Sequence, residues 1–426
     1  MKSKLANKSN NFINVFGPGI LFAGAAIGTS HLVQSTRAGA SFGLGLLLIV
    51  IFANVIKYPF FRFGPLYTAA TGKSILSGYK DLGGWAVVML IVTELPVNII
   101  IVAATALVTA AIALSVFDLA LGVTNVAVAL IFIAMILISV GGYKFIDRCV
   151  KFFVAVLTVG TVTATILTLP SVNFAFDNFI PPEMDALTIA FVLALLGFMP
   201  AGVSLSIMHS VWSVEKAKAT GYRPKVAEVM TDLNIGYIGS AVLAVCFLIM
   251  GAGTMHGNGV ELSSNAGAFA GQIISLYSSK LGVWAGFVVG LSVFAVMIST
   301  LLTILDGFSR MHEGAINQLL NSNDGTHSDD VAEKSLHRLM MVVIGALACL
   351  VLAVFMTNFK SFIDFVTIAA FVLGPVIAIL NHIVMHAKAI PTSLKPSLLM
   401  TIWSLTGIVF LILLTCFYLL SKYGVF

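Results

Sequence analysis

The sequence predicts an all-α membrane protein with eleven transmembrane helices, and three observations support this prediction. Of the 426 residues, 59% are hydrophobic and only 10% are charged, whereas about 25% of the residues in a typical soluble domain are charged. Apolar segments of about 20 residues or more, the length of a helix that crosses a bilayer, recur along the whole chain. Glycine, proline and charged residues separate these segments, as at Thr71-Gly72-Lys73 and Pro181-Pro182-Glu183.

The first predicted helices follow a polar, basic tail, residues 1–16, which we expect to lie in the cytoplasm. The first apolar segment is expected to be a retained helix, because no clear cleavage site of small residues marks it as a signal peptide. Five helices are predicted in this half, at residues 17–39, 43–71, 85–115, 122–141 and 148–169. The pair Gly141-Gly142 punctuates the boundary after the fourth of them.

The second half begins after an acidic loop at 170–185. Six helices are predicted here, at residues 186–213, 231–253, 281–306, 337–356, 361–386 and 398–420. The polar stretch 307–336 between two of these helices is expected to be a mobile cytoplasmic linker. Since little of the chain remains for a soluble domain, we predict one transmembrane domain over residues 17–426.

The distribution of basic residues predicts the orientation. If the helices alternate in direction, most of the 23 Lys and Arg residues fall on the side of the N-terminus. Those on the opposite side are Arg37, Lys280, Lys360 and Lys422. Because loops rich in Lys and Arg stay in the cytoplasm, we expect an integral protein of a bacterial inner membrane, with its N-terminus inside and its C-terminus outside. Basic residues in short loops beside apolar helices do not indicate nucleic-acid binding.

Sequence motifs of enzymes and of cofactor sites are missing. The four cysteines show no CxxC spacing, so neither a disulfide framework nor a zinc site is expected. The sequence also contains no HExxH, GxSxG or phosphate-loop motif. We therefore expect neither an enzyme nor a bound cofactor.

Two predicted helices contain residues that interrupt a helix near its middle. The first contains Gly28 followed by Thr29 and Ser30, whose hydroxyls compete for backbone hydrogen bonds. The sixth contains Pro200 within the glycine-flanked stretch 197–202, and proline removes one helix donor. Either interruption alone fits an ordinary kink, because glycine and proline are common in membrane helices.

The two interrupted helices hold matching positions if the chain contains an inverted repeat of five helices. Repeat one would cover about 17–169 and repeat two about 186–386, with 398–420 as an extra helix. Paired interruptions in two halves point to a substrate site near the midplane of a secondary transporter.

The order of several short stretches resembles the Nramp family (natural resistance-associated macrophage proteins). These stretches are Phe16-Gly17-Pro18-Gly19, residues 37–43, the TELP stretch at 93–96, Met199-Pro200 and ISTLLTILDGFSR at 298–310. The resemblance covers nearly the whole chain. It implies a proton-coupled divalent-metal transporter with the LeuT-type fold, a five-plus-five inverted repeat in which helices 1 and 6 are discontinuous.

At the metal site that the resemblance implies, this sequence departs from the family pattern. The family's Asp-Pro-Gly-Asn is replaced by residues 28–31, Gly-Thr-Ser-His, so the anionic ligand is missing. The family's Met-Pro-His becomes Met199-Pro200-Ala201, which keeps the thioether and loses the histidine. Hard divalent ions prefer carboxylate and other oxygen ligands. The altered site is therefore expected to favour softer ions such as Cu, Zn, Ni or Co.

The resemblance and these departures define the candidate site residues. Substrate binding is expected from Gly28, Thr29, Ser30, His31, Leu196 (through its backbone carbonyl), Met199 and Gly202. His31 and Met199 are the candidate metal ligands, and His31 and Glu94 are the candidates for proton coupling. The alternatives are structural: hydrogen bonding for His31, packing for Met199, and pairing with Lys57 or Arg37 for Glu94.

Two functions are compatible with these residues. The first is a secondary active transporter of a divalent metal ion, linked to protons. The second is the same scaffold carrying a non-metal solute such as a carboxylate, since His31, Arg37, Lys57 and exposed half-helix amides suit an anion. The expected partners are the lipid bilayer and the transported ion or small solute, and the sequence carries no signal for an oligomeric state.

Overall fold

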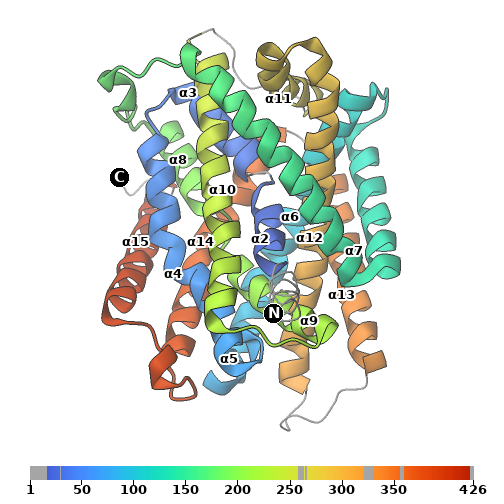
Figure 1. Ribbon diagram of the computed structural model, residues 1–426, viewed down its shortest axis with the longest axis vertical. Helices are drawn as coiled ribbons and strands as arrows, with labels where there is room; N and C mark the ends of the chain where they lie inside the picture. Colours follow the sequence, from blue (N-terminus) through green and yellow to red (C-terminus); the bar gives the residue numbers. More distant parts are fainter. Residues whose placement is uncertain are drawn as a thin grey trace, which may run out of the picture.

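The structure, a computed structural model, describes residues 17–28, 30–257, 263, 266–320, 330–355 and 359–422. All regular elements in this part of the chain are helices (Figure 1). The predicted tail, residues 1–16, and the candidate residue Thr29 lie outside it.

The helices of the first half are α2 (Pro18–Ala26), the π-helix η1 (Ser30–Ser35), α3 (Thr36–Phe42), α4 (Leu47–Thr71), α5 (Ile75–Leu82), α6 (Gly84–Phe117) and α7 (Val123–Thr168). The short 3₁₀ turns η2 (Leu169–Ser171) and η3 (Phe176–Phe179) connect the halves. The second half contains α8 (Ala186–Phe198), α9 (Leu205–Thr220), α10 (Val226–Thr254), α11 (Ala266–Leu281), α12 (Val283–Leu320), α13 (Asp330–Phe355), α14 (Phe359–His386), the 3₁₀ turn η4 (Thr392–Leu394) and α15 (Leu398–Lys422).

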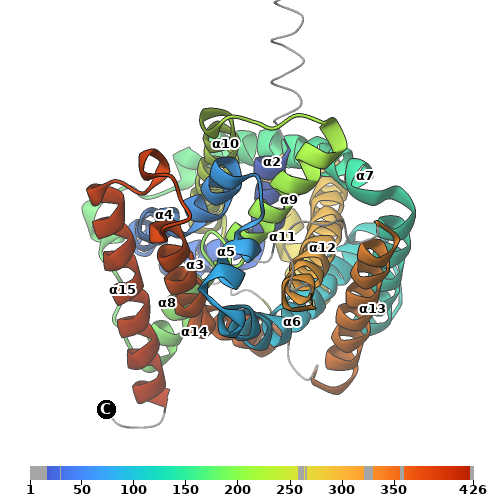
Figure 2. The same ribbon diagram turned by 90° about the horizontal axis from the view of Figure 1, so that it is seen from below.

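The helices form a bundle in which α13 and α15 lie at opposite edges in both views (Figures 1 and 2). Below, the end of the bundle with α3 and α11 is the upper side, and the end with α5 and the start of α2 is the lower side, as drawn in Figure 1. Nine stretches of the described chain are long and apolar enough to cross a membrane; one lies within α7, and another runs from α7 through η2. The interrupted pairs α2–α3 and α8–α9 complete the eleven predicted helices.

Both predicted interruptions are confirmed. The first helix stops at Ala26 and resumes as a π-helix at Ser30 before it becomes α3. The sixth helix stops at Phe198, and α9 begins only at Leu205. Because Pro200 has no N–H, it cannot donate to the carbonyl of Leu196 four residues earlier, and the helix ends there.

The first half-helix packs closely on α10 through glycine. A Cβ at Gly236 would overlap the carbonyl oxygen of Gly19, and a Cβ at Gly19 would overlap the carbonyl of Asp232. Small residues at such crossings let two helix backbones approach closely in a membrane.

This contact gives a matched pair of stability predictions. We expect Gly236→Ala to destabilise the protein by about 1–3 kcal/mol, because the added methyl group pushes α2 away from α10. Gly239→Ala on the same helix has no atom within 4 Å of its new Cβ and should stabilise by up to about 1 kcal/mol through helix propensity. Thermal unfolding of the purified variants measures both, and equal Tm values would contradict the close contact.

Three features of the fold differ from the prediction. The polar stretch 307–336 is not a linker throughout, because α12 continues to Leu320 and α13 starts at Asp330; residues 321–329 lie outside the described part. The extension of α12 buries Phe308, Met311 and Ala315 at helical spacing, which anchors a stretch whose composition is polar.

α5 and α11 were not predicted, because each is too short or too polar to stand out by hydropathy.

Candidate functional site

A small cavity of about 40 Å³ lies where the two interruptions meet. Its wall includes Ala25 of α2, Thr105 of α6, Thr300 of α12, and Gly202 and Ser204 from the gap between α8 and α9. A Cβ at Gly202 would meet only the Ser204 hydroxyl, at 3.6 Å, so the backbone here borders open space. The volume holds a few water molecules or one small ion, and its polar lining consists of hydroxyl and backbone groups.

Glu94 of α6 lies behind this wall. Glu94 is 5% exposed, and its carboxylate interacts with the Ser204 hydroxyl. Tyr79 of α5 lies outside the membrane-spanning segments. Its burial, and to a smaller extent the negative charge of Glu94, raise the pKa of its phenol. The Tyr79 phenol therefore stays neutral and donates to the Asn381 side chain at 2.7 Å, which ties α5 to α14.

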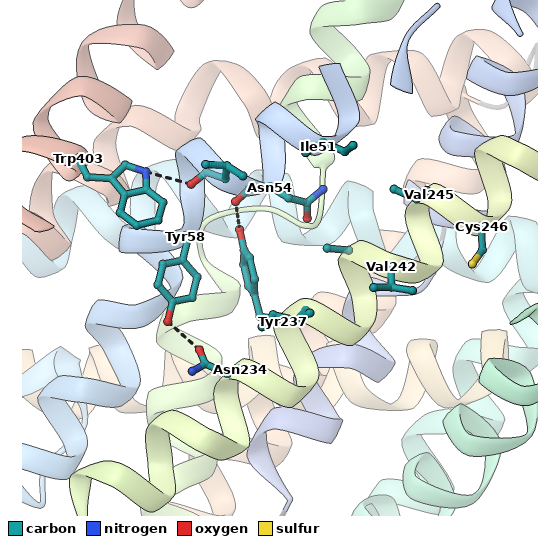
Figure 3. A pocket seen from close by; sticks show the side chains of 12 residues that line it. Ile51, Asn54, Tyr58, Asn234, Tyr237, Val242, Val245, Cys246 and Trp403 are labelled. Carbon is teal, nitrogen blue, oxygen red and sulfur yellow. Dashed lines mark hydrogen bonds between the residues drawn. The ribbon is translucent and has the colours of Figure 1, made fainter. Parts of the chain in front are cut away.

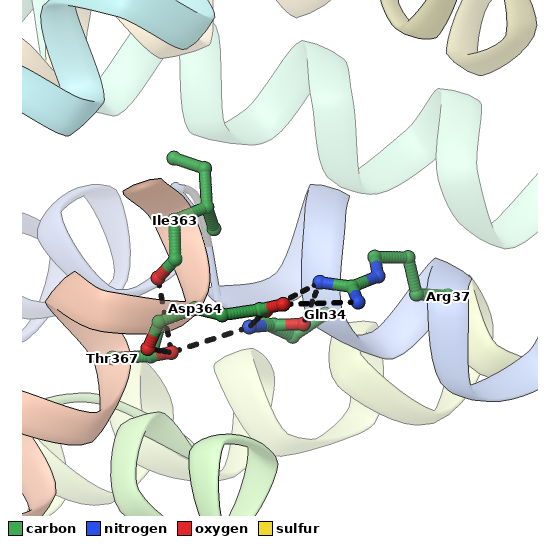
Figure 4. A network of polar contacts seen from close by, with 5 residues as sticks. All are labelled: Gln34, Arg37, Ile363, Asp364 and Thr367. Carbon is green, nitrogen blue, oxygen red and sulfur yellow. Dashed lines mark hydrogen bonds and ion pairs between the residues drawn. The ribbon is translucent and has the colours of Figure 1, made fainter. Parts of the chain in front are cut away.

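A polar network closes the bundle on the upper side of the cavity (Figure 4). Arg37 of α3 pairs with Asp364 of α14 at 2.6 Å and 3.4 Å. Gln34 of η1 accepts from Arg37 at 3.1 Å and donates to Asp364 and Thr367 at 3.3 Å each. The Arg37 guanidinium also lies 4.8 Å above the ring of Phe191 in α8. Both interrupted helices are thus connected to α14 above the cavity.

A second set of contacts fixes the start of α2 on the lower side. The carboxylate of Asp232 in α10 accepts from the backbone N–H of Gly17 at 3.2 Å and of Gly19 at 2.7 Å. A carboxylate at this position satisfies free amides and complements the positive end of the helix. His209 of α9 lies 3.8 Å from the same carboxylate. The elements α2, α9 and α10 therefore meet at Asp232.

An ion pair joins α9 to α12, and a histidine contact joins α12 to α13, further towards the lower side. Arg310 pairs with Asp306 at 2.9 Å and with Glu215 of α9 at 3.2 Å. His337 of α13 lies 3.4 Å from Asp306. Asp306 is 1% exposed, so it is not a solvated helix cap.

Lys57 of α4 reaches the end of α8. Its ammonium donates to the backbone carbonyls of Leu196, Gly197 (2.8 Å) and Met199 (3.0 Å). The side chain is 1% exposed. The Leu196 carbonyl, a predicted substrate ligand, is therefore already bound to an internal cation.

The structure brings only part of the predicted site to the cavity. Gly202 lines it, and Gly28 lies next to it, since a Cβ there would come within 2.8 Å of Thr300. Ser30 belongs to the π-helix η1 by its backbone. Met199 is fully buried in an apolar cluster and does not line the cavity.

His31 points towards α10 instead. Its Nε2 lies 3.0 Å from the carbonyl oxygen of Ser240, so this nitrogen carries a proton and donates. Ligation of a metal through Nε2 requires that bond to break and that proton to leave. Within the described residues, no three or more His, Cys, Asp or Glu side chains gather in a way that could hold a metal ion.

Sequence reasoning did not single out Thr105, Thr300 or Asp232. Hydroxyl residues in apolar helices are common and give little signal. Asp232 could have been identified as a carboxylate just inside the predicted helix 231–253. Lys57 was noticeable as a charge within the predicted helix 43–71.

A separate crevice lies on the outer surface of the bundle between α4, α10 and α15 (Figure 3). Its volume is about 500 Å³, and apolar side chains dominate its wall. Tyr58 donates to Asn234 at 2.7 Å and Tyr237 to the Asn54 carbonyl at 2.6 Å, so the phenols are satisfied within the protein. Because Val55 and Ile238 beside it are at least half exposed, this crevice faces the bilayer and is distinct from the central cavity.

Comparisons with known proteins agree with this architecture. A family model described as natural resistance-associated macrophage protein-like matches residues 19–421. An uncharacterized protein of Pasteurella multocida (strain Pm70) is 31% identical over 370 residues, which cover 86% of this chain and 83% of that protein.

Two solved structures are similar in fold at low sequence identity. A crystal structure of a variant of the Eremococcus coleocola manganese transporter has a TM-score of 0.69 at 14% identity, over 96% of this chain and 87% of that one. MhsT in complex with L-phenylalanine has a TM-score of 0.64 at 14% identity, over 95% and 98% of the chains. These likenesses confirm the predicted fold class, an all-α membrane protein of LeuT type with two discontinuous helices.

Proposed function

Because the chain belongs to the family of natural resistance-associated macrophage protein-like (Nramp) proteins, we propose that it is a secondary active transporter whose cargo is a metal ion. The observation that carries this proposal is the cavity between the two interrupted helices. Polar contacts hold both of these helices above it and below it. Transporters with broken helices bind their cargo at such a site. The site opens first to one side and then to the other, as one set of contacts breaks and the other forms.

The chemistry of the cavity supports a cation as cargo. The hydroxyls of Thr105, Ser204 and Thr300 and the backbone at Gly202 offer oxygen ligands. Glu94, whose carboxylate interacts with the Ser204 hydroxyl, supplies a negative charge when it is ionised, and this charge offsets the cost of a cation in a medium of low dielectric. The similarity to a manganese transporter favours a divalent metal. We propose proton linkage through Glu94.

The predicted pair His31 and Met199 has a more distant part in this proposal. Both side chains contact other groups in this conformation, so they reach the cargo only if they turn into the cavity. As a soft pair they would shift selectivity towards Cu, Zn, Ni or Co.

A second candidate function is transport of a non-metal solute such as a small carboxylate. The observation that favours it is Lys57, whose ammonium occupies the Leu196 carbonyl that was expected to face a metal. A fixed positive charge at the end of α8, where Phe198 lines the cavity, attracts an anion and repels a dication.

Flux through proteoliposomes tests the two functions. We expect uptake of at least one of Mn²⁺, Co²⁺, Ni²⁺, Zn²⁺ or Cd²⁺ to exceed that of protein-free vesicles and to respond to an imposed pH gradient. Uptake of an organic anion while every one of these metals fails would reject the metal proposal in favour of the second candidate.

Substitution of Glu94 separates the proposed roles of the ionisable groups. We expect Glu94→Gln to lower metal uptake by about tenfold or more, since loss of about 1.4 kcal/mol of cation binding is a factor of ten. His31→Ala should lower uptake or alter metal preference only if His31 enters the cavity. Unchanged uptake and pH dependence in Glu94→Gln would remove Glu94 from the mechanism, and the same result in His31→Ala would remove His31.

The proposed orientation, with the N-terminus in the cytoplasm and the C-terminus outside, rests on the distribution of Lys and Arg. Reporter fusions at the C-terminus test it. Activity of a reporter that works only outside the inner membrane supports the assignment.

A further inference from the structure

The carboxyl end of α8 presents carbonyl groups that the helix cannot satisfy. The last four carbonyls of any helix lack intrahelical partners, and here Pro200 removes the donor that would have reached Leu196. The chain then leaves the helix, with Met199 in an extended conformation. The aligned peptide dipoles give such an end about half a negative charge.

Lys57 meets this end with a matching number of groups. An ammonium has three donors and no acceptor, and the ammonium of Lys57 donates to three carbonyls, those of Leu196, Gly197 and Met199. Among the described residues, no carboxylate lies within ion-pair distance of it. Its charge is therefore balanced by backbone carbonyls, in a site with 1% exposure.

Carbonyl oxygens at the ends of broken helices are also the groups that coordinate mobile coupling cations in transporters of this architecture. The Lys57 ammonium carries the charge of such an ion and is surrounded by carbonyl oxygens in the same way. Unlike a free ion, it is attached to α4. A neutral side chain of equal length would leave the three carbonyls buried and unpaired, which is unfavourable.

We propose that Lys57 is a built-in cation. It holds the position at the end of α8 that a free monovalent cation would otherwise occupy, and it removes the need for one. Loss of the ammonium exposes a site for a dehydrated Na⁺ or K⁺. The binding part of this inference stands on the carbonyl geometry alone, whereas its consequence for the ion requirement of uptake rests on the proposed transport function.

The test uses the full-length protein with Lys57→Met, which keeps the length of the side chain and removes its charge. Thermal unfolding of the purified protein is followed in N-methylglucamine chloride, NaCl and KCl at equal ionic strength. We expect the variant to melt several degrees below the wild type in N-methylglucamine chloride. NaCl or KCl should raise the Tm of the variant. At cation concentrations above the Kd of the exposed site, the Tm should rise with the logarithm of the cation concentration, as it does for any ligand that binds the folded state. The wild type should show no difference among the three salts.

Lys73→Met provides the matched control. Lys73 is exposed just beyond the end of α4, so its loss should leave the Tm and the salt response of the wild type unchanged. A Tm of Lys57→Met that is independent of the cation overturns the proposal. If Lys57→Met can be purified as folded protein only in NaCl or KCl, the result supports the proposal. If it cannot be purified in any of the three salts, Lys57→Gln is measured in its place. A Tm of Lys57→Gln that does not depend on the cation would then overturn the proposal.

Uptake assays distinguish this inference from the proposed function. Na⁺- or K⁺-dependent uptake in Lys57→Met beside cation-independent uptake in the wild type supports both. A cation-dependent Tm in a protein that moves no metal in either form supports the built-in cation and rejects metal transport.

Discussion

Asp364→Asn is expected to open the upper side of the central cavity. This substitution removes the charge that holds Arg37, the link between the first broken helix and α14. The Arg37 side chain is 10% exposed and that of Asp364 is 30% exposed, so solvent screens part of the pair. We expect the closed state to lose about 1–2 kcal/mol of stability relative to the state that is open on the upper side. This shifts the equilibrium between the two states about five- to thirtyfold towards the open one.

A single cysteine in the cavity reports this opening. Thr105→Cys is placed in a chain whose native cysteines have been replaced, and a membrane-impermeant thiol reagent is added from one side at a time. The closed cavity, about 40 Å³, has no room for the reagent, so the rate of modification measures opening. Asp364→Asn should speed modification from the upper side only.

The control for this measurement is Asp118→Asn, which removes an exposed carboxylate at the end of α6. It should leave the rate unchanged. Faster modification from the lower side, or an equal effect of Asp118→Asn, would show that the Arg37–Asp364 pair is not an upper closure.

Asp232→Asn is expected to produce the opposite effect, opening the lower side. The charged carboxylate caps α2 with two backbone hydrogen bonds and is 2% exposed. Hydrogen bonds to a charged group contribute about 1.5–3 kcal/mol each. An amide keeps one acceptor but no charge, so we expect the start of α2 to detach about tenfold or more often.

The same Thr105→Cys reporter measures this outcome. Modification from the lower side should accelerate, while modification from the upper side stays at the wild-type rate. Asp81→Asn, an exposed carboxylate on α5, serves as the control. Because the two variants share one reporter, an increase from the same side in both would contradict the assignment of separate closures.

The wider architecture was predictable because its causes are local in sequence. Apolar segments long enough for a bilayer define the membrane helices, since the cost of exposing polar groups to lipid applies to each segment by itself. The interruption at Pro200 follows from the missing N–H of one residue. In contrast, the extension of α12 to Leu320 depends on partners for Met311 and Ala315 that come from other helices, so composition alone assigned it to a linker.

The site was predicted less completely, because side-chain direction depends on contacts made across the bundle. Gly202 lines the cavity and Gly28 lies beside it, as expected of residues next to the two interruptions. Nothing in the sequence indicated that His31 would turn to Ser240 on α10 or that Met199 would pack into an apolar cluster. Glu94 was expected near Lys57 or Arg37 in its structural alternative, yet its carboxylate interacts with Ser204.

By itself, the sequence determined that the protein is a many-helix membrane protein, which helices are interrupted, and to which family it is similar. These properties depend on hydropathy, on backbone donors and on the order of short motifs. Only the tertiary structure decided which charge meets which partner: Arg37 with Asp364, Asp232 with the start of α2, and Lys57 with the end of α8. The partners lie far apart in sequence, and in a medium of low dielectric the position of each buried charge is set by the groups that can neutralise it.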